Sequence, residues 1–291
     1  MNITKAVIPV AGWGTRSLPA TKNVPKEMLP IFRKPIVQYI VEEGIGAGLT
    51  DVVFVTNQNK TIIEDHFDRN FLLEQLLERA GKTSMLEEVR RVASLVNVIG
   101  VRQKEQLGLG HAVLTAREVC QNEPFAVMLG DDLMFGVQTG IGELIKTAEA
   151  TGKAVIGVIE VPPSKVSRYG VIQGEAIDSH TYRVTSLVEK PTPEKAPSNL
   201  AIIGRYVLLP EIFDILEGQR AGVGGEIQLT DALQGLADRD KLLAVRLGGQ
   251  RFDAGDWVEY LTANIYFALQ DEELRDELVK RLRELLSCSS S

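Results

Sequence analysis

The sequence is poor in the residues that build metal centres and disulfide frameworks. It has only two cysteines among 291 residues, Cys120 and Cys288, and three histidines, His66, His111 and His180. Neither cysteine belongs to a CxxC pair, and the histidines are scattered along the chain. This spacing excludes a disulfide framework and argues strongly against a zinc site.

Long apolar runs and an excess of positive charge are also missing. No apolar run reaches the roughly 18 residues of a membrane-spanning helix, and we expect no signal peptide. Lys plus Arg number 32 against 39 Asp plus Glu, which gives a net charge of −7. That balance argues against nonspecific nucleic-acid binding, but a local basic pocket can still take a small anion. We expect a cytoplasmic protein that binds neither nucleic acid nor membrane.

The order of the apolar segments predicts an α/β fold. Strands that alternate with helices favour a parallel sheet with right-handed crossovers. Two shorter segments, 169–173 and 185–189, indicate further strands that pair in the antiparallel sense, and one helix is expected over 257–286. The other expected elements are strands at 6–11, 51–56, 96–101, 125–129 and 154–161, and helices at 35–46, 62–79, 85–94 and 111–119.

Two loops near the N-terminus carry groups that suit phosphate. Gly12-Trp13-Gly14-Thr15-Arg16 follows the first strand, and glycines let backbone N–H groups approach an anion closely. Arg16 adds a fork of donors, and Lys26 lies on a loop stiffened by prolines. The first loop matches neither a Walker A loop nor the dinucleotide fingerprint. Each loop alone is consistent with an ordinary turn, whereas the two together indicate phosphate binding.

Two carboxylates, Asp131 and Asp132, end an apolar strand. Side chains at the carboxyl edge of a parallel sheet lie where ligands bind. Magnesium takes one or two protein carboxylates and completes its shell with phosphate oxygens and water. An isolated Asp-Asp is also consistent with a turn or a helix cap.

With these motifs in view, the chain resembles the bacterial UTP–glucose-1-phosphate uridylyltransferases of the sugar-nucleotide pyrophosphorylase superfamily. The resemblance extends from Ala6 to about Leu278. It is carried by AGWGTR at 11–16, PATK at 19–22, PKEMLP at 25–30, QKE at 103–105, GLGHA at 108–112, LGDD at 129–132, YGVI at 169–172, VEKP at 188–191, APSNLA at 196–201 and GEIQLTDA at 225–232.

The resemblance implies a Rossmann-like three-layer α/β fold with a central, mostly parallel mixed sheet and a C-terminal helix. It implies a catalytic domain over 1–256, with a nucleotide-binding half at about 1–135 and a sugar-binding half at about 136–256. Residues 257–291 would form a helical segment that contacts another subunit. Relatives commonly associate, so we expect a homodimer or homotetramer.

The implied reaction joins UTP and glucose 1-phosphate into UDP-glucose and releases pyrophosphate, with Mg²⁺ as cofactor. A phosphate monoester is mostly dianionic at pH 7, so the attacking oxygen needs no general base. We assign Arg16 to the leaving pyrophosphate, Lys26 to the α-phosphate and Lys190 to the attacking sugar phosphate. By resemblance, Asp131 and Asp253 hold the metal ion.

The resemblance also implies which residues hold the two ends of UDP-glucose. The sugar end is assigned to Asp132, Gly170, Glu189 and Lys190. The nucleotide end is assigned to a second group, which acts partly through main-chain atoms: Ala11, Gly12, Gly14, Gln103 and Gly108.

The sequence departs from the family pattern at two positions. Trp257 stands where relatives usually carry a lysine, and Ser17 stands where an apolar residue is usual. Trp257 is consistent with packing at the base of the C-terminal helix, where Val258, Leu261 and Ile265 continue an apolar face. It is also consistent with weaker binding of the anionic substrates.

Three rival functions remain open. A glucose-1-phosphate thymidylyltransferase differs in its base by one methyl group, which a pocket discriminates by only about 1–3 kcal/mol. A glycosyltransferase on a similar sheet would lack the Lys26 loop. A non-catalytic sugar-nucleotide-binding regulator would have lost phosphate or metal groups, yet all of them are present.

Overall fold

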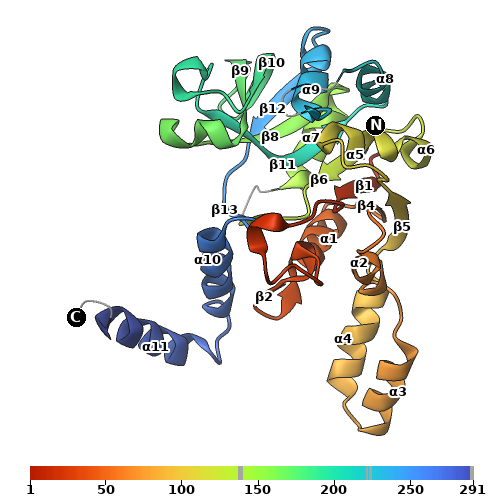
Figure 1. The fold of residues 1–291 in the computed structure, drawn as a ribbon, viewed down its shortest axis with the longest axis vertical. Helices are drawn as coiled ribbons and strands as arrows, with labels where there is room; N and C mark the ends of the chain where they lie inside the picture. The colour runs from red at the N-terminus through yellow and green to blue at the C-terminus, as the bar shows by residue number, and fades with distance from the viewer. Residues whose placement is uncertain (137–139, 221, 223–224, 289–291) are drawn as a thin grey trace.

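The protein is built on one large sheet. The computed structural model describes residues 1–136, 140–220, 222 and 225–288. The strands are β1 (Lys5–Pro9), β4 (Asp51–Thr56), β5 (Asn97–Arg102), β6 (Phe125–Met128), β8 (Ala154–Glu160), β9 (Gly170–Ala176), β10 (Thr181–Glu189), β11 (Leu200–Leu208) and β12 (Leu242–Arg246). These nine strands lie in the order β5-β4-β1-β6-β11-β8-β12-β10-β9 (Figure 1).

The sheet is parallel at one end and mixed at the other. Strands β5, β4, β1 and β6 are parallel neighbours. Strand β11 runs antiparallel to both β6 and β8, while β8 and β12 are parallel. Strands β9 and β10 pair in the antiparallel sense, as their short alternating segments predict. The predicted mixed α/β sheet is confirmed.

Helices cover both faces of the sheet and complete three layers. In β1, Ala6 and Ile8 belong to one core and Val7 to the other, because successive strand side chains point to opposite faces. The first core includes α1 (Ile36–Gly46) and α7 (Ile141–Thr151). The second includes α5 (Leu109–Thr115), α8 (Glu211–Glu217) and α9 (Leu229–Ala237), with the short α6 (Arg117–Cys120) beside α5.

Two small strand pairs shape the edge of the sheet where the site lies. Strand β7 (Asp132–Phe135) pairs with β13 (Gln250–Asp253), and this register sets Asp253 opposite Asp132. Strand β2 (Pro30–Ile31) pairs with β3 (Lys34–Pro35). Short 3-10 turns connect the pieces: η1 (Thr15–Ser17), η2 (Lys26–Met28), η3 (Pro163–Arg168) and η4 (Pro193–Lys195).

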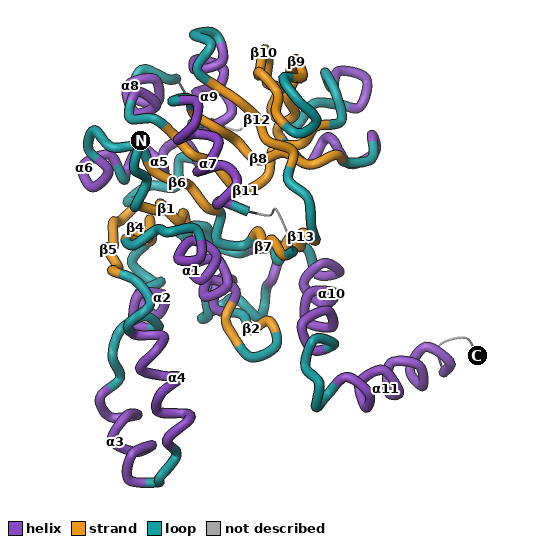
Figure 2. The backbone as a smooth tube through the Cα atoms, turned by 180° about the vertical axis from the view of Figure 1, so that it is seen from behind, coloured by secondary structure: helices purple, strands orange, loops and turns teal. Residues whose placement is uncertain are grey.

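Two helical arms extend from the body in both views (Figures 1 and 2). One contains α2 (Thr61–Asp65), α3 (Phe71–Arg79) and α4 (Thr83–Ala93), and the other α10 (Trp257–Ala268) and α11 (Arg275–Cys288). The predictions of one helix over 62–79 and one over 257–286 are therefore wrong. Asn70 accepts a hydrogen bond from the Leu73 amide and begins α3, while Asp271 accepts from the amides of Glu273 and Leu274 before α11.

The C-terminal helices leave apolar side chains in solvent. Val258 is 72% exposed and Leu261 56%, so the predicted apolar face of α10 does not pack on the protein's own core. Helix α10 buries Ala263, and α11 buries no residue. Within the described part of the chain, none of the helices has the length and apolarity that crossing a membrane requires.

Candidate active site

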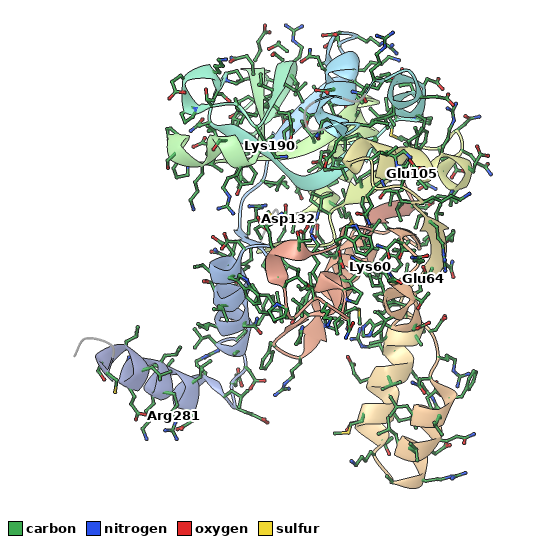
Figure 3. All side chains as sticks on the ribbon, in the orientation of Figure 1. Lys60, Glu64, Glu105, Asp132, Lys190 and Arg281 are labelled. Atoms are coloured by element: carbon green, nitrogen blue, oxygen red, sulfur yellow. The ribbon has the colours of Figure 1, made fainter. Side chains whose placement is uncertain are left out.

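Seven of the predicted site residues line one cavity of about 220 Å³ at the edge of the sheet: Arg16, Asp131, Asp132, Gly170, Glu189, Lys190 and Asp253. They come from segments up to 237 positions apart, and the fold alone brings them together. In the view of Figure 3, Asp132 lies between Lys190 above and Lys60 below. A larger cavity of about 520 Å³ is lined by Glu160, His180 and Arg246 among others, and contains none of the predicted residues.

Lys26 is bonded to Asp131, one of the two carboxylates predicted to hold a metal ion. Its ammonium contacts Asp131 Oδ2. Burial alone would lower the pKa of Lys26, but the attraction of Asp131 outweighs it and the pKa is raised. Burial would likewise raise the pKa of Asp131, yet Lys26 and Arg16 hold it below its usual value. Both groups are therefore charged at neutral pH.

A second buried ion pair stands behind Lys26. Glu27, which is almost fully buried, accepts a hydrogen bond from Lys60 Nζ at 2.7 Å. Burial raises the pKa of the Glu27 carboxyl and lowers that of the Lys60 ammonium. Lys60, Glu27, Lys26 and Asp131 thus form a row of alternating charges that fixes the short turn η2.

The residues around Gly255 fit a magnesium ion. A Cβ added to Gly255 would lie 3.0 Å from Asp253 Oδ1, 3.4 Å from Asp131 Oδ2 and 3.6 Å from Arg16 Nη1. Glycine therefore leaves open a point on which two carboxylates and a guanidinium converge. Burial and the charge of Asp131 raise the pKa of Asp253, so the two carboxylates repel one another. Two carboxylates with room for phosphate oxygens are what Mg²⁺ takes.

The described residues form no cluster of three or more side chains suited to a metal. A two-carboxylate site does not require one, because substrate oxygens and water complete the shell of Mg²⁺. The fit therefore rests on Asp131, Asp253 and the space beside Gly255.

Asp132 faces a different set of partners. Its carboxylate accepts from Arg251 Nε at 2.7 Å, from Arg251 Nη2 at 3.1 Å and from the Gly204 amide at 2.8 Å. Its carbonyl accepts from the fully buried Arg205, which also pairs with Glu43 of α1 at 2.6 Å. The residue is 4% exposed and ties β7 to β11 and β13. Its predicted contact with the sugar stays a prediction.

The predicted sugar residues gather beside β9 and β10. Glu189 Oε2 accepts from Thr230 Oγ1 at 2.6 Å, and Lys190 Nζ lies 3.1 Å from Glu189 Oε1. A Cβ on Gly170 would lie 3.1 Å from both Glu189 Oε2 and Thr230 Oγ1. Both side chains therefore pack closely against the backbone of β9 at Gly170. Lys190 has a φ of 45°, a strained conformation of the kind that clusters at functional sites.

Two of the predicted nucleotide residues, Gln103 and Gly108, lie just before α5. Gly108 begins that helix with a φ of 98°, and a Cβ there would come within 2.8 Å of Glu226 and 3.0 Å of the Ile227 carbonyl. Gln103 Nε2 donates to the Gly108 carbonyl at 3.2 Å and lies 2.9 Å from His111 Nδ1.

The glycine loop lies next to this nucleotide group. Asn57 and Gln106 donate to the Ala11 carbonyl at 2.7 and 2.8 Å. Gly14 has a φ of 64° and leads into η1, where Arg16 lies, while a Cβ on Gly12 would meet nothing within 4 Å. Trp13, Gln103 and Gln106 line a cavity of about 480 Å³.

Sequence reasoning missed several residues of this site. Arg251 lies two positions before Asp253, so strand alternation places both on one face of β13, and this signal was readable. Thr230 belongs to a block that carries the resemblance. The ion pair of Lys60 with Glu27 joins positions 33 apart, and no local sequence pattern predicts it.

Comparisons with known proteins show relatives over nearly the whole chain. The nucleotidyl transferase family model matches residues 5–269. UTP–glucose-1-phosphate uridylyltransferases from Staphylococcus haemolyticus and Bacillus subtilis are 50% and 49% identical, over 98% of this chain and 99% and 98% of their own.

Solved structures show the same likeness. A UTP-bound UGPase from Acinetobacter baumannii is 40% identical, with a TM-score of 0.90 over 98% of this chain and 100% of that one. A UDP-glucose pyrophosphorylase complexed with UDP-glucose is 40% identical, with a TM-score of 0.85 over 93% and 100%. A putative glucose-1-phosphate thymidylyltransferase from Bacillus anthracis, 21% identical, shares the fold at a TM-score of 0.69 over 90% and 94%. The chain belongs to the nucleotidyl transferase family and, within it, to the UTP–glucose-1-phosphate uridylyltransferases.

Proposed function

We propose that the protein joins UTP and glucose 1-phosphate into UDP-glucose and pyrophosphate. The sugar phosphate attacks the α-phosphate of UTP in line with the leaving pyrophosphate. The observation that carries the proposal is the convergence of Arg16, Asp131, Asp253, Glu189 and Lys190 on one cavity. Relatives with this activity, about 50% identical over nearly the whole chain, support it.

Charge neutralisation is the main task of this site. UTP and the sugar phosphate bring about six negative charges, since terminal phosphates carry close to −2 each. Arg16, Lys26, Lys190 and one divalent cation would offer roughly +5, of which the carboxylates of Asp131 and Asp253 cancel about 2. These positive groups thus offset part of the repulsion between the substrates, and positioning does the rest.

Each of the three cationic side chains binds a different phosphate group of the substrates. Arg16 holds the leaving pyrophosphate, Lys26 holds the α-phosphate and stabilises the charge that builds there, and Lys190 holds the attacking phosphate. The phosphate dianion already carries the attacking electron pair, so no residue has to take up a proton. Glu189 accepts hydrogen bonds from sugar hydroxyls, oriented by Thr230.

We propose that Asp131 and Asp253 hold Mg²⁺. When bound, the ion supplies charge neutralisation and holds phosphate oxygens in position. Asp131 and Asp253 would hold the ion, and the Lys26 ammonium, which contacts Asp131 here, would bind the α-phosphate. The repulsion between Asp131 and Asp253 supports this assignment.

The division of labour and the assembly also belong to the proposal. Residues of about 1–135 bind the nucleotide, about 136–256 bind the sugar, and 257–291 contact another subunit in a homodimer or homotetramer. The exposed apolar side chains of α10 support the last point. The cytoplasmic location stays a prediction.

A pyrophosphate-release assay over a panel of substrates tests the proposal. UTP, dTTP, ATP and GTP are each combined with glucose 1-phosphate and with galactose 1-phosphate. The highest kcat/KM should belong to UTP with glucose 1-phosphate. A preference for dTTP would instead make the protein a thymidylyltransferase, and release from no combination would leave only a sugar-nucleotide-binding role.

A further inference from the structure

One face of helix α10 is bonded to the phosphate-binding segment. Trp257 Nε1 donates to the Arg16 carbonyl at 3.2 Å, and the Tyr260 hydroxyl donates to the Pro30 carbonyl at 2.8 Å. Asn264 Oδ1 accepts from the Phe32 amide at 2.9 Å. Trp257, Tyr260 and Asn264 are spaced by three and four, so they lie on the same side of the helix.

All three bonds reach main-chain atoms between 16 and 32, the segment that carries Arg16 and Lys26. Local structure orients both partners of the bond between Asn264 and Phe32. Asn264 Nδ2 donates to the Tyr260 carbonyl at 3.0 Å, which turns its oxygen toward Phe32. Phe32 itself has a left-handed φ of 54°. Figure 1 shows α10 running beside β2, and close contacts between the two elements agree.

The first turn of α10 is anchored on the metal side of the site. Asp256 accepts from the Val258 amide at 3.0 Å and from Arg168 Nη2 at 3.0 Å. Three residues earlier, Asp253 accepts from the Gly255 amide at 2.9 Å. Trp257 therefore connects a helix fixed beside the metal carboxylates to the carbonyl of Arg16.

Trp257 is 47% exposed, so it is not packed in the protein's core. Its indole N–H donates to the protein's own backbone. Weaker binding of the anionic substrates stays a prediction. The ring meets Tyr260 edge-on at 5.8 Å, so the two members of the contact support one another.

We infer that Trp257, together with Tyr260 and Asn264, is a positioning residue for Arg16. The hydrogen bond fixes the carbonyl of Arg16, and so it holds the guanidinium beside Gly255, Asp131 and Asp253. This inference rests on the proposed function, in which Arg16 binds pyrophosphate. It predicts that loss of the bond weakens the hold on pyrophosphate and leaves the sugar-phosphate side unchanged.

The test measures both directions of the reaction on three variants. Trp257→Phe removes the donor and keeps an aromatic ring, and Tyr260→Phe removes only a hydroxyl. Tyr266→Phe is the matched control, because it makes the Tyr260 change on the same helix. Among the described contacts, the Tyr266 ring packs on Phe252 at 5.3 Å and its hydroxyl bonds to nothing in 16–32.

We expect Trp257→Phe to raise the KM for pyrophosphate about tenfold, the order expected for one lost hydrogen bond. Tyr260→Phe should raise it in the same direction, and it carries the test if Trp257→Phe does not fold. The KM for glucose 1-phosphate should stay at the wild-type value, as should both constants of Tyr266→Phe.

Two results overturn the inference. In one, the variants match Tyr266→Phe; in the other, both KM values rise together, as general loosening of the fold would produce. Wild-type turnover is measured first, so that a failure of the proposed function is seen separately. If the wild type does not turn over, both the proposed function and the positioning role are rejected. If the wild type is active and the variants are unaffected, only the positioning role is rejected.

Discussion

The Lys26 ammonium contacts the Asp131 carboxylate, although 105 positions separate the two residues. One belongs to the phosphate-binding loop and the other to the proposed metal site. Each charge offsets part of the burial cost of the other, since the pKa of Lys26 is raised and that of Asp131 is lowered. In the absence of substrate the pair keeps both groups charged and in place.

Removal of Lys26 should act on the chemical step. Lys26→Ala should lower kcat about 10²- to 10³-fold, as the loss of one preorganised charge donor does. The KM for UTP should change much less. Lys22→Ala, on an exposed position of the same segment, is the control. A raised KM with an unchanged kcat would show that Lys26 only binds substrate.

The proposed metal ligand Asp253 allows a prediction for both activity and stability. Asp253→Asn should abolish magnesium-dependent turnover in a folded protein. Without Mg²⁺ at pH 7 it should also raise the Tm, because burial and Asp131 raise the pKa of Asp253 and a raised carboxyl pKa destabilises the folded state at higher pH. That gain should shrink as the pH falls toward the ordinary value of 3.8, because the carboxyl becomes protonated in the folded state first and in both states below that pH.

Thermal melts between pH 4 and 8, with and without Mg²⁺, check this. Added Mg²⁺ should raise the Tm of the wild type and not that of Asp253→Asn. Asp214→Asn, an exposed aspartate paired with Arg117, is the control and should behave as wild type. Near-normal turnover of Asp253→Asn at saturating Mg²⁺ would refute the metal assignment.

The buried pair of Asp132 and Arg251 should be structural in its effect. Arg251→Met leaves the Asp132 carboxylate without its two-pronged partner and should lower the free energy of unfolding by about 3–5 kcal/mol. Arg117→Met, on a surface pair, should change stability little. Denaturant unfolding measures both. Adding Asp132→Asn to Arg251→Met should recover part of the loss; an equal or larger loss in the double variant would contradict the pairing.

The exposed apolar face of α10 predicts association. Light scattering should report a particle larger than 32.0 kDa at micromolar concentration. Val258→Gln with Leu261→Gln should shift it toward the monomer, while Thr262→Gln, the same new side chain on a neighbouring polar position, should not. A wild-type particle of 32.0 kDa would reject the subunit contact.

Local sequence patterns predicted the elements whose apolar residues follow one regular spacing. The buried strands and α1 follow from apolar runs and helical spacing, and the residues of the cavity follow from the family motifs. Asn70 was readable as a helix cap and Asp271 as a turn residue, but both stand within a continuous charged and apolar pattern that predicts an unbroken helix.

Other features depend on contacts that no local pattern encodes. The full burial of Arg205 follows from Glu43, which lies 162 positions away on α1. The bond between Trp257 and the Arg16 carbonyl joins positions 241 apart and uses a main-chain atom, which is the same in every residue type. The sequence shows Trp257 as a departure from the family pattern, but it does not show that the indole bonds to the Arg16 carbonyl.

The central claim is a single in-line displacement at the α-phosphate with no enzyme nucleophile, and the fate of a chiral phosphorus tests it most directly. One diastereomer of UTP with sulfur on the α-phosphate is incubated with glucose 1-phosphate and Mg²⁺, and the configuration of the sulfur-labelled UDP-glucose is read by ³¹P NMR. A single displacement inverts the phosphorus, so UDP-glucose should form with inverted configuration. Retained configuration would contradict it, because two displacements through a covalent nucleotidyl-enzyme would then be required.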